Sequence, residues 1–134
     1  MALAALSLRD RQGHDVNPGS SAAVREYLLG ARADNMAYML SAQLAAMSLS
    51  LHHGLVDRGA LVRAPGFAAA NRNDLATVGD LVAAAGATLH SFGLTPSGHP
   101  MRQHQELLKD LLEEANHDRG YVAPSPATCP PPVF

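Results

Sequence analysis

The clearest pattern in the sequence is a stretch of helical spacing in the first half of the chain. From Met36 to His53, large apolar residues recur every three or four positions, and small residues occupy the opposite side. The large set is Met36, Met39, Leu40, Leu44, Met47 and Leu51, and the small set is Ala37, Ser41, Ala45 and Ser48. Neighbouring helices can approach such a small face closely, while methionines fill gaps on the other face. We therefore predict a central helix over residues 36–53, with Asp34 or Asn35 as its N-cap and Gly54 just after its end.

Two further helices are predicted on either side of this one. Asn17-Pro18 combines a capping side chain with a residue suited to the first helical position, and the apolar face that follows is Val24, Tyr27 and Leu28. Thr77 and Asp80 have the spacing of a capping box, and the stripe behind them is Val78, Leu81, Val82, Ala85 and Leu89. The first of these helices should end near Gly30 and the second near Gly93.

A last helix is predicted to open at Pro100 and to stop between Asn116 and Gly120. Its apolar stripe is Met101, His104, Leu108, Leu111, Leu112 and Ala115. The acidic residues and Lys109 fall mostly on the other side, which should face water. Because His104 lies on the apolar stripe, we expect it to be packed in the core.

Two stretches lack a helical pattern. Residues 55–73 contain the turn signal Ala64-Pro-Gly66 and should be irregular, while residues 123–134 hold five prolines and cannot form a helix. The prediction is an all-α fold: a four- to five-helix bundle over residues 1–122, with a Pro-rich tail over residues 123–134. We expect the tail to pack on the domain through Val133 and Phe134.

The composition favours a helical fold and argues against some classes of binding partner. Apolar residues make up 47% of the 134 residues, but aromatic residues only 4%, so the core must be built mainly from aliphatic side chains. The formal net charge is −2 and the basic residues are scattered, which argues against nucleic acid and anionic membranes as partners. The longest apolar stretch, residues 36–56, contains Gln43, several serines and two histidines, and is too polar to insert in a membrane.

The lone cysteine and the first residues say little about location. Cys129 cannot form a disulfide within the chain. The stretch from Met1 to Arg9 has no basic segment ahead of its apolar run, so it is not expected to act as a signal peptide.

A series of short motifs runs through nearly the whole chain. They are Leu6-Ser-Leu-Arg9, Gly13, the run Asp34 to Met47, Gly54-Leu-Val56, Ala60-Leu61, Ala64-Pro-Gly66, Ala76-Thr-Val78, Ser97-Gly98, Pro100, Arg102, Gln105-Glu106, Leu108-Lys109 and Ala115-Asn116. Taken in this order they resemble a helical domain found near the C-terminus of predicted secreted or surface-exposed, adhesin-like multidomain bacterial proteins. The run from Asn35 to Met47 is the most specific part. His99 stands where that family favours a small N-cap residue, and His104 where it favours an aromatic one.

The resemblance implies where the protein is located and that it is part of a larger protein, but it implies no catalytic activity. It places the chain outside the cell or at the cell surface, within a larger protein. That family has no established activity, so no catalytic residue can be carried over to this sequence.

The seven histidines are the main candidates for chemistry. His52 and His53 are adjacent on the predicted helix, about 100° apart, and cannot both face one ion from a regular turn. His99 and His104 are five positions apart, another poor interval for chelation. We therefore expect neither a metal site nor a cofactor, and we expect these histidines to be surface or half-buried residues, with a local zinc site as the alternative.

An enzymatic alternative remains open on the sequence alone. His52 and His53 with Asp57, and His90 beside Ser91, are the closest groupings of proton donors and acceptors. They are the candidate residues of a small His-dependent hydrolase acting on an ester or lactone. The G-x-S-x-G motif of a nucleophile elbow does not occur. The favoured hypothesis is a non-catalytic structural or interaction module of an extracellular bacterial surface protein, binding an unknown protein or surface ligand, with its oligomeric state open.

Overall fold

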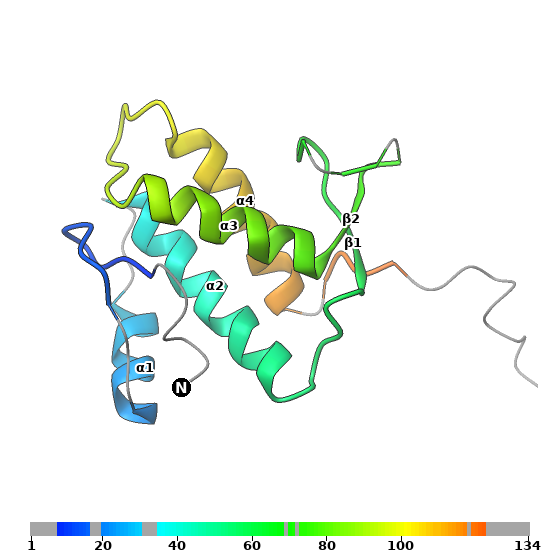
Figure 1. Cartoon of the computed structure of the whole chain (residues 1–134), viewed down its shortest axis with the longest axis horizontal. Helices are drawn as coiled ribbons and strands as arrows, with labels where there is room; N and C mark the ends of the chain where they lie inside the picture. Colours follow the sequence, from blue (N-terminus) through cyan, green and yellow to red (C-terminus); the bar gives the residue numbers. More distant parts are fainter. Residues whose placement is uncertain are drawn as a thin grey trace, which may run out of the picture.

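The fold is seen in a computed structural model that describes residues 8–16, 20–30, 35–68, 70–71, 73–117 and 119–122. These residues form four helices packed together and one small hairpin (Figure 1). The helices are α1 (Ser21–Leu29), α2 (Met36–His52), α3 (Val78–Ser91) and α4 (Arg102–Asn116), and the strands are β1 (Leu61–Arg63) and β2 (Leu75–Thr77). The helical architecture is confirmed. The all-α class is wrong in one respect, because it leaves no place for the hairpin.

The predicted central helix is confirmed as α2, which contacts the other three helices. Leu40, Leu44 and Met47 are fully buried on its large face, and Ala37, Ser41 and Ala45 are fully buried among its small residues. Asn35 caps its start, since its Oδ1 accepts from the Ala37 N–H at 3.1 Å. Gly54, two residues past the end, has φ +73°, a conformation that glycine adopts without steric cost.

The hairpin is the element that the sequence pattern missed. β1 and β2 pair antiparallel, with Val62 opposite Ala76, and a turn that contains Asp74 at φ +59° lies between them. Residues 120–122 run along the other side of β1, where Arg63 N–H donates to Gly120 O and Val122 N–H donates to Leu61 O, both at 2.9 Å. β1 is therefore bonded on both sides, which stabilises a strand of only three residues.

The starts of the last two helices follow different rules. At α3 the predicted capping box is present, with Asp80 N–H donating to Thr77 Oγ1 at 3.0 Å and Thr77 N–H to Asp80 Oδ2 at 3.2 Å. At α4 the N-cap is Met101, which makes no side-chain cap bond. α4 thus begins slightly later than the prediction at Pro100, and it ends at Asn116, within the predicted range.

The expectation that His104 is a core residue is wrong. Gln105, Leu108, Leu112 and Ala115 are the buried positions of α4, and His104 is exposed. Leu108, Leu112 and Ala115 of the predicted stripe are buried, so the observed stripe differs from it mainly at one position, where Gln105 replaces His104. Gln105 takes the buried place because partners for its amide surround it, as described below.

The two ends of the described chain bear on other predictions. α1 begins at Ser21 with Ser20 as N-cap, so it starts later than the prediction at Asn17-Pro18, which lies outside the described residues. The tail of residues 123–134, with Cys129 and the proposed docking residues Val133 and Phe134, also lies outside them. Among the residues that are described, no helix is long and apolar enough to cross a membrane.

Candidate functional site

The densest cluster of buried polar groups lies where the start of α2 meets the loop between α3 and α4. Asn35, 1% exposed, is at its centre. Besides capping α2, its Oδ1 accepts from Thr95 N–H at 2.8 Å, and its Nδ2 donates to Asp10 O at 3.1 Å and to Gly93 O at 3.0 Å. One side-chain amide therefore joins three segments that are distant in sequence.

Thr95 and Gln105 extend this cluster into the core, and both are fully buried. The Thr95 hydroxyl donates to Gln105 Oε1 at 2.6 Å and accepts from the Ala37 N–H at 2.9 Å. Gln105 Nε2 donates to Phe92 O at 2.9 Å and to Thr88 Oγ1 at 3.3 Å. The amide of Gln105 is thus satisfied on both its oxygen and its nitrogen, which is what a buried amide requires for stability.

Arg9 ties the N-terminal loop to the end of α3. Its Nε donates to Leu89 O at 3.0 Å and its Nη2 to His90 O at 3.1 Å, while Nη1 donates to Gly13 O at 3.1 Å and lies 3.2 Å from the Asp15 carboxylate. A cation at the last carbonyls of a helix satisfies unpaired acceptors and complements the helix dipole. The guanidinium is therefore a C-terminal cap for α3, and each of its three nitrogens makes a hydrogen bond within the fold.

Two tyrosines close the other side of the same loop. Tyr27 donates its hydroxyl hydrogen to Arg9 O at 2.6 Å, and Tyr38 donates to Tyr27 O at 2.8 Å, with the ring centroids 5.0 Å apart. Burial raises the pKa of the Tyr27 phenol well above its ordinary value. Tyr27 therefore stays protonated at neutral pH and acts as a structural hydrogen-bond donor.

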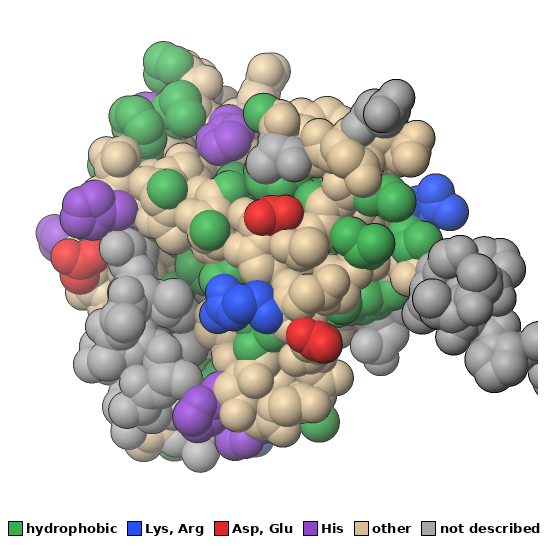
Figure 2. Space-filling view, turned by 45° about the vertical axis from the view of Figure 1, so that its right-hand side comes forward, with side chains coloured by type: hydrophobic (Ala, Val, Ile, Leu, Met, Phe, Trp, Pro, Cys, Tyr) green, Lys and Arg blue, Asp and Glu red, His purple; other side chains and the backbone are tan. Residues whose placement is uncertain are grey.

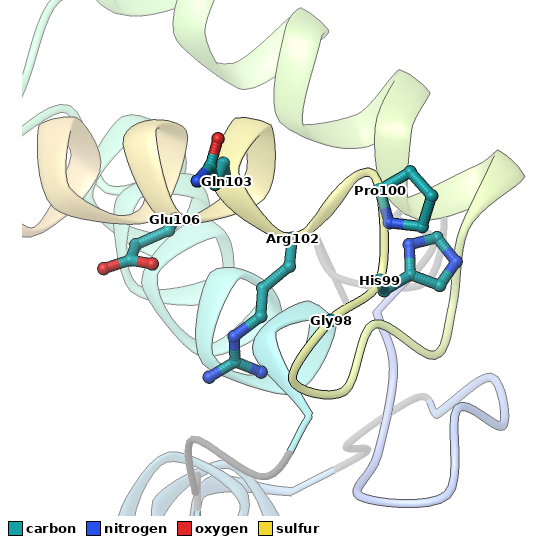
Figure 3. A pocket seen from close by; sticks show the side chains of 6 residues that line it. All are labelled: Gly98, His99, Pro100, Arg102, Gln103 and Glu106. Carbon is teal, nitrogen blue, oxygen red and sulfur yellow. The ribbon is translucent and has the colours of Figure 1, made fainter.

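Shallow hollows open on the described surface at the start of α4 and beside β1. One, of about 430 Å³, lies at the start of α4 and is lined by Gly98, His99, Pro100, Arg102, Gln103 and Glu106. Figure 3 shows that its polar side chains splay apart: the Arg102 guanidinium, the Glu106 carboxylate and the Gln103 amide point in different directions. Such an arrangement does not gather reactive groups around one substrate atom.

The second hollow, also of about 430 Å³, lies beside β1. It is lined by Asp57, Gly59, Ala60, Leu61, Tyr121 and Val122. Its lining is mainly apolar, and Leu61 is 40% exposed there. The Asp57 carboxylate accepts from Gly59 N–H at 3.0 Å and so shapes the turn that leads into β1.

The candidate hydrolase residues do not form one cluster. His52 and His53 are exposed at the end of α2, with ring centroids 5.3 Å apart. His90 is exposed at the end of α3, and its carbonyl is bound by Arg9 near the opposite end of α2. The 17 residues of α2 span about 25 Å, so His90 cannot join the pair. Within the described ranges, no group of three His, Cys, Asp or Glu side chains is placed to hold a metal ion.

The residues that sequence reasoning missed are Thr95 and Gln105. Gln105 had a detectable signal, because residues 105, 108, 112 and 115 follow helical spacing as well as the predicted stripe does. Thr95 had none, since its burial depends on contacts with distant segments.

Comparison with known proteins adds no relative. No protein-family model matches this chain, and no curated protein or solved structure is detectably similar to it. The resemblance to the helical domain of bacterial surface proteins therefore stays a prediction.

Proposed function

We propose that this chain is a non-catalytic interaction module of an extracellular bacterial surface protein, and that it contacts its partner through the loop between α3 and α4. The observation that carries the proposal is the exposure of large apolar side chains there. Phe92 is 38% exposed and Leu94 is 49% exposed, and Pro96 and Pro100 on the same loop are also exposed. Figure 2 shows hydrophobic side chains gathered at the corner of the molecule where this loop lies. Grouped apolar side chains on a surface are typical of interaction sites.

The polar groups support the non-catalytic part of the proposal. The groups best suited to bind or polarise a substrate are the side chains of Asn35, Gln105 and Arg9. All three form hydrogen bonds with backbone or side-chain partners within the fold. The histidines proposed for a hydrolase are exposed and lie at opposite ends of α2. An enzyme of this size would need such groups to converge within hydrogen-bond reach of one another.

A crosslinking experiment tests the interaction surface. A photoreactive amino acid is placed at position 94 in the α3–α4 loop, and in a matched protein at position 29, since Leu29 is 67% exposed on α1. In intact producing cells, we expect a discrete crosslinked product from position 94 that Phe92→Ser weakens and that position 29 does not give. Equal labelling from both positions, or none from either, would contradict the proposed surface.

Two further measurements test location and catalysis. Protease added to intact producing cells should digest the protein, and full protection in unbroken cells would refute the extracellular placement. Purified protein should hydrolyse activated esters and lactones no faster than the His52→Ala, His53→Ala double variant. A rate about a hundredfold above that variant, typical of acid–base catalysis, would establish the hydrolase instead.

A further inference from the structure

The start of α4 is capped by a histidine ring in place of the usual oxygen. Met101, the N-cap residue, makes no side-chain cap bond, and its N–H donates to the His99 Nδ1 at 3.0 Å. The backbone of His99 is fixed on both sides, because His99 N–H donates to Pro96 O at 3.0 Å and Arg102 N–H donates to His99 O at 3.1 Å. The imidazole nitrogen takes the role that the Asn35 Oδ1 takes at α2, where it also accepts from the N–H two residues on.

This contact depends on the protonation state of the ring. Nδ1 accepts a hydrogen bond only in the neutral tautomer that carries its hydrogen on Nε2. Protonation converts Nδ1 into a donor that faces another donor, and it places a positive charge at a helix N-terminus, where the helix dipole disfavours cations. We propose that His99 makes the N-terminal cap of α4 a pH-sensitive switch, closed when the ring is neutral and released when it is protonated.

The groups around the ring act in opposite directions. The Phe92 ring, which packs edge-on with centroids 6.0 Å apart, is neutral. Arg102 and Glu106 line the same hollow as His99. The Arg102 cation opposes a second positive charge, while the Glu106 carboxylate favours one, and Figure 3 shows Glu106 a turn further along α4 and directed away from the imidazole. Once the ring is charged, the loss of the hydrogen bond and the helix dipole therefore act together to release the cap.

Two other described histidines make a different kind of contact. His117 Nδ1 lies 2.8 Å from Glu113 O, an acceptor, so this ring nitrogen must already donate. His14 Nδ1 lies 3.8 Å from the Asp10 carboxylate, which attracts an imidazolium. His99 differs because its ring nitrogen faces an N–H. A difference in pH response between the native protein and a His99 variant can therefore be assigned to His99 and not to the other histidines.

The switch acts on the loop proposed above as the interaction surface. Residues 96–101 connect the exposed Phe92 and Leu94 to α4, and Arg102 Nη1 donates to Thr95 O at 3.0 Å, which links the cap to the buried cluster. Acidification that protonates the His99 ring should loosen this loop first. The switch itself follows from the geometry of His99 and stands whether or not the loop binds a partner.

The test compares the native protein with His99→Asn by amide hydrogen exchange and by NMR of the histidine nitrogens. Asn offers the same type of acceptor two residues before the bonded N–H, as Asn35 does, and it does not titrate. In the native protein, the exchange protection of the Met101 amide should fall about tenfold between pH 7.5 and pH 5, once corrected for the intrinsic exchange rate. In His99→Asn it should stay constant. His104→Gln, a change at an exposed site on the same helix, should behave like the native protein.

Two results would overturn the proposal. One is an equal fall in protection in His99→Asn and in the native protein. The other is a nitrogen spectrum of the native protein at pH 7.5 in which the neutral His99 ring carries its hydrogen on Nδ1. The second measurement needs no variant, so it can overturn the proposal even if His99→Asn does not fold.

Discussion

Adding one methyl group at Gly93 should release the Arg9 cap and destabilise the protein. A Cβ at Gly93 would lie 2.7 Å from the Arg9 Nε, 2.8 Å from the Arg9 Cζ and 2.8 Å from the Gly13 carbonyl oxygen. These separations are too short for non-bonded atoms, so the guanidinium would have to move. Movement would break its hydrogen bonds to Leu89 O and His90 O at the end of α3.

The expected cost of Gly93→Ala follows from two terms. Overpacking a tight site typically costs about 1–3 kcal/mol. Loss of a hydrogen bond to a charged group costs about 1.5 kcal/mol or more, and little of this is screened because the Arg9 side chain is only 16% exposed. We therefore expect Gly93→Ala to lower the free energy of unfolding by about 2.5–4.5 kcal/mol, measured by urea denaturation followed by circular dichroism.

The chain supplies its own control in Gly86, in the interior of α3. A Cβ there meets no atom within 4 Å, so Gly86→Ala adds helix propensity without a clash. It should stabilise the protein by about 0.5–1 kcal/mol. In an Arg9→Ala background, Gly93→Ala should cost less, because part of the obstruction is gone. A Gly93→Ala protein as stable as the native one, or an unchanged cost in the Arg9→Ala background, would refute the role assigned to Arg9.

Three further predictions use other parts of the fold. Leu44→Ala should lower the free energy of unfolding by about 2–5 kcal/mol, because Leu44 is fully buried in α2, and an effect near zero in urea denaturation would place it at the surface. Tyr27→Phe should cost about 1 kcal/mol at neutral pH, from loss of the bond to Arg9 O. Because burial raises the Tyr27 pKa, the stability that this phenol contributes should be fully present below about pH 10 and should decrease above it, as tyrosine in the unfolded protein ionises. In melting scans, the melting temperature of Tyr27→Phe should therefore decrease less steeply above this pH. Exhaustive chelation should leave the melting temperature unchanged, and a collapse would reveal a structural metal.

The sequence predicted those elements whose signals are local. The long apolar stripe located α2, Asn35 and Gly54 bounded it, and the spacing of Thr77 and Asp80 located the start of α3. Each of these signals lies within a few residues of the structure that it specifies. Such elements can be predicted without knowing what packs against them.

The hairpin could not be predicted in this way. Its strands have three residues each, too few for an alternating pattern to emerge. Its turn depends on Asn71, whose Oδ1 accepts from the N–H groups of Asn73 and Leu75 at 2.8 and 3.1 Å. Its other stabilising partner, the segment 120–122, arrives from the far end of the described chain. Long-range pairing of short segments leaves little trace in local periodicity.

The exchange of His104 for Gln105 in the buried stripe of α4 has a related cause. A hydrophobic pattern assigns Gln105 to the surface, since a buried amide without partners is costly. In the structure Thr95, Thr88 and Phe92 O supply those partners, and all three lie outside α4. Once the amide is satisfied, the helix can turn Gln105 inward and His104 outward.

The buried cluster also explains why a motif resemblance can indicate a fold without indicating an activity. Arg9, Asn35 and Ser41 belong to the motifs on which the resemblance rests, and all three hold the same corner together. Arg9 N–H donates to Ser41 Oγ at 2.9 Å, and the Asn35 amide binds the carbonyl of Asp10, the residue after Arg9. Their polar groups hold the N-terminal loop against α2 and α3. The exposed side chains of Phe92 and Leu94, on which the proposed interaction surface rests, are not among the residues of these motifs.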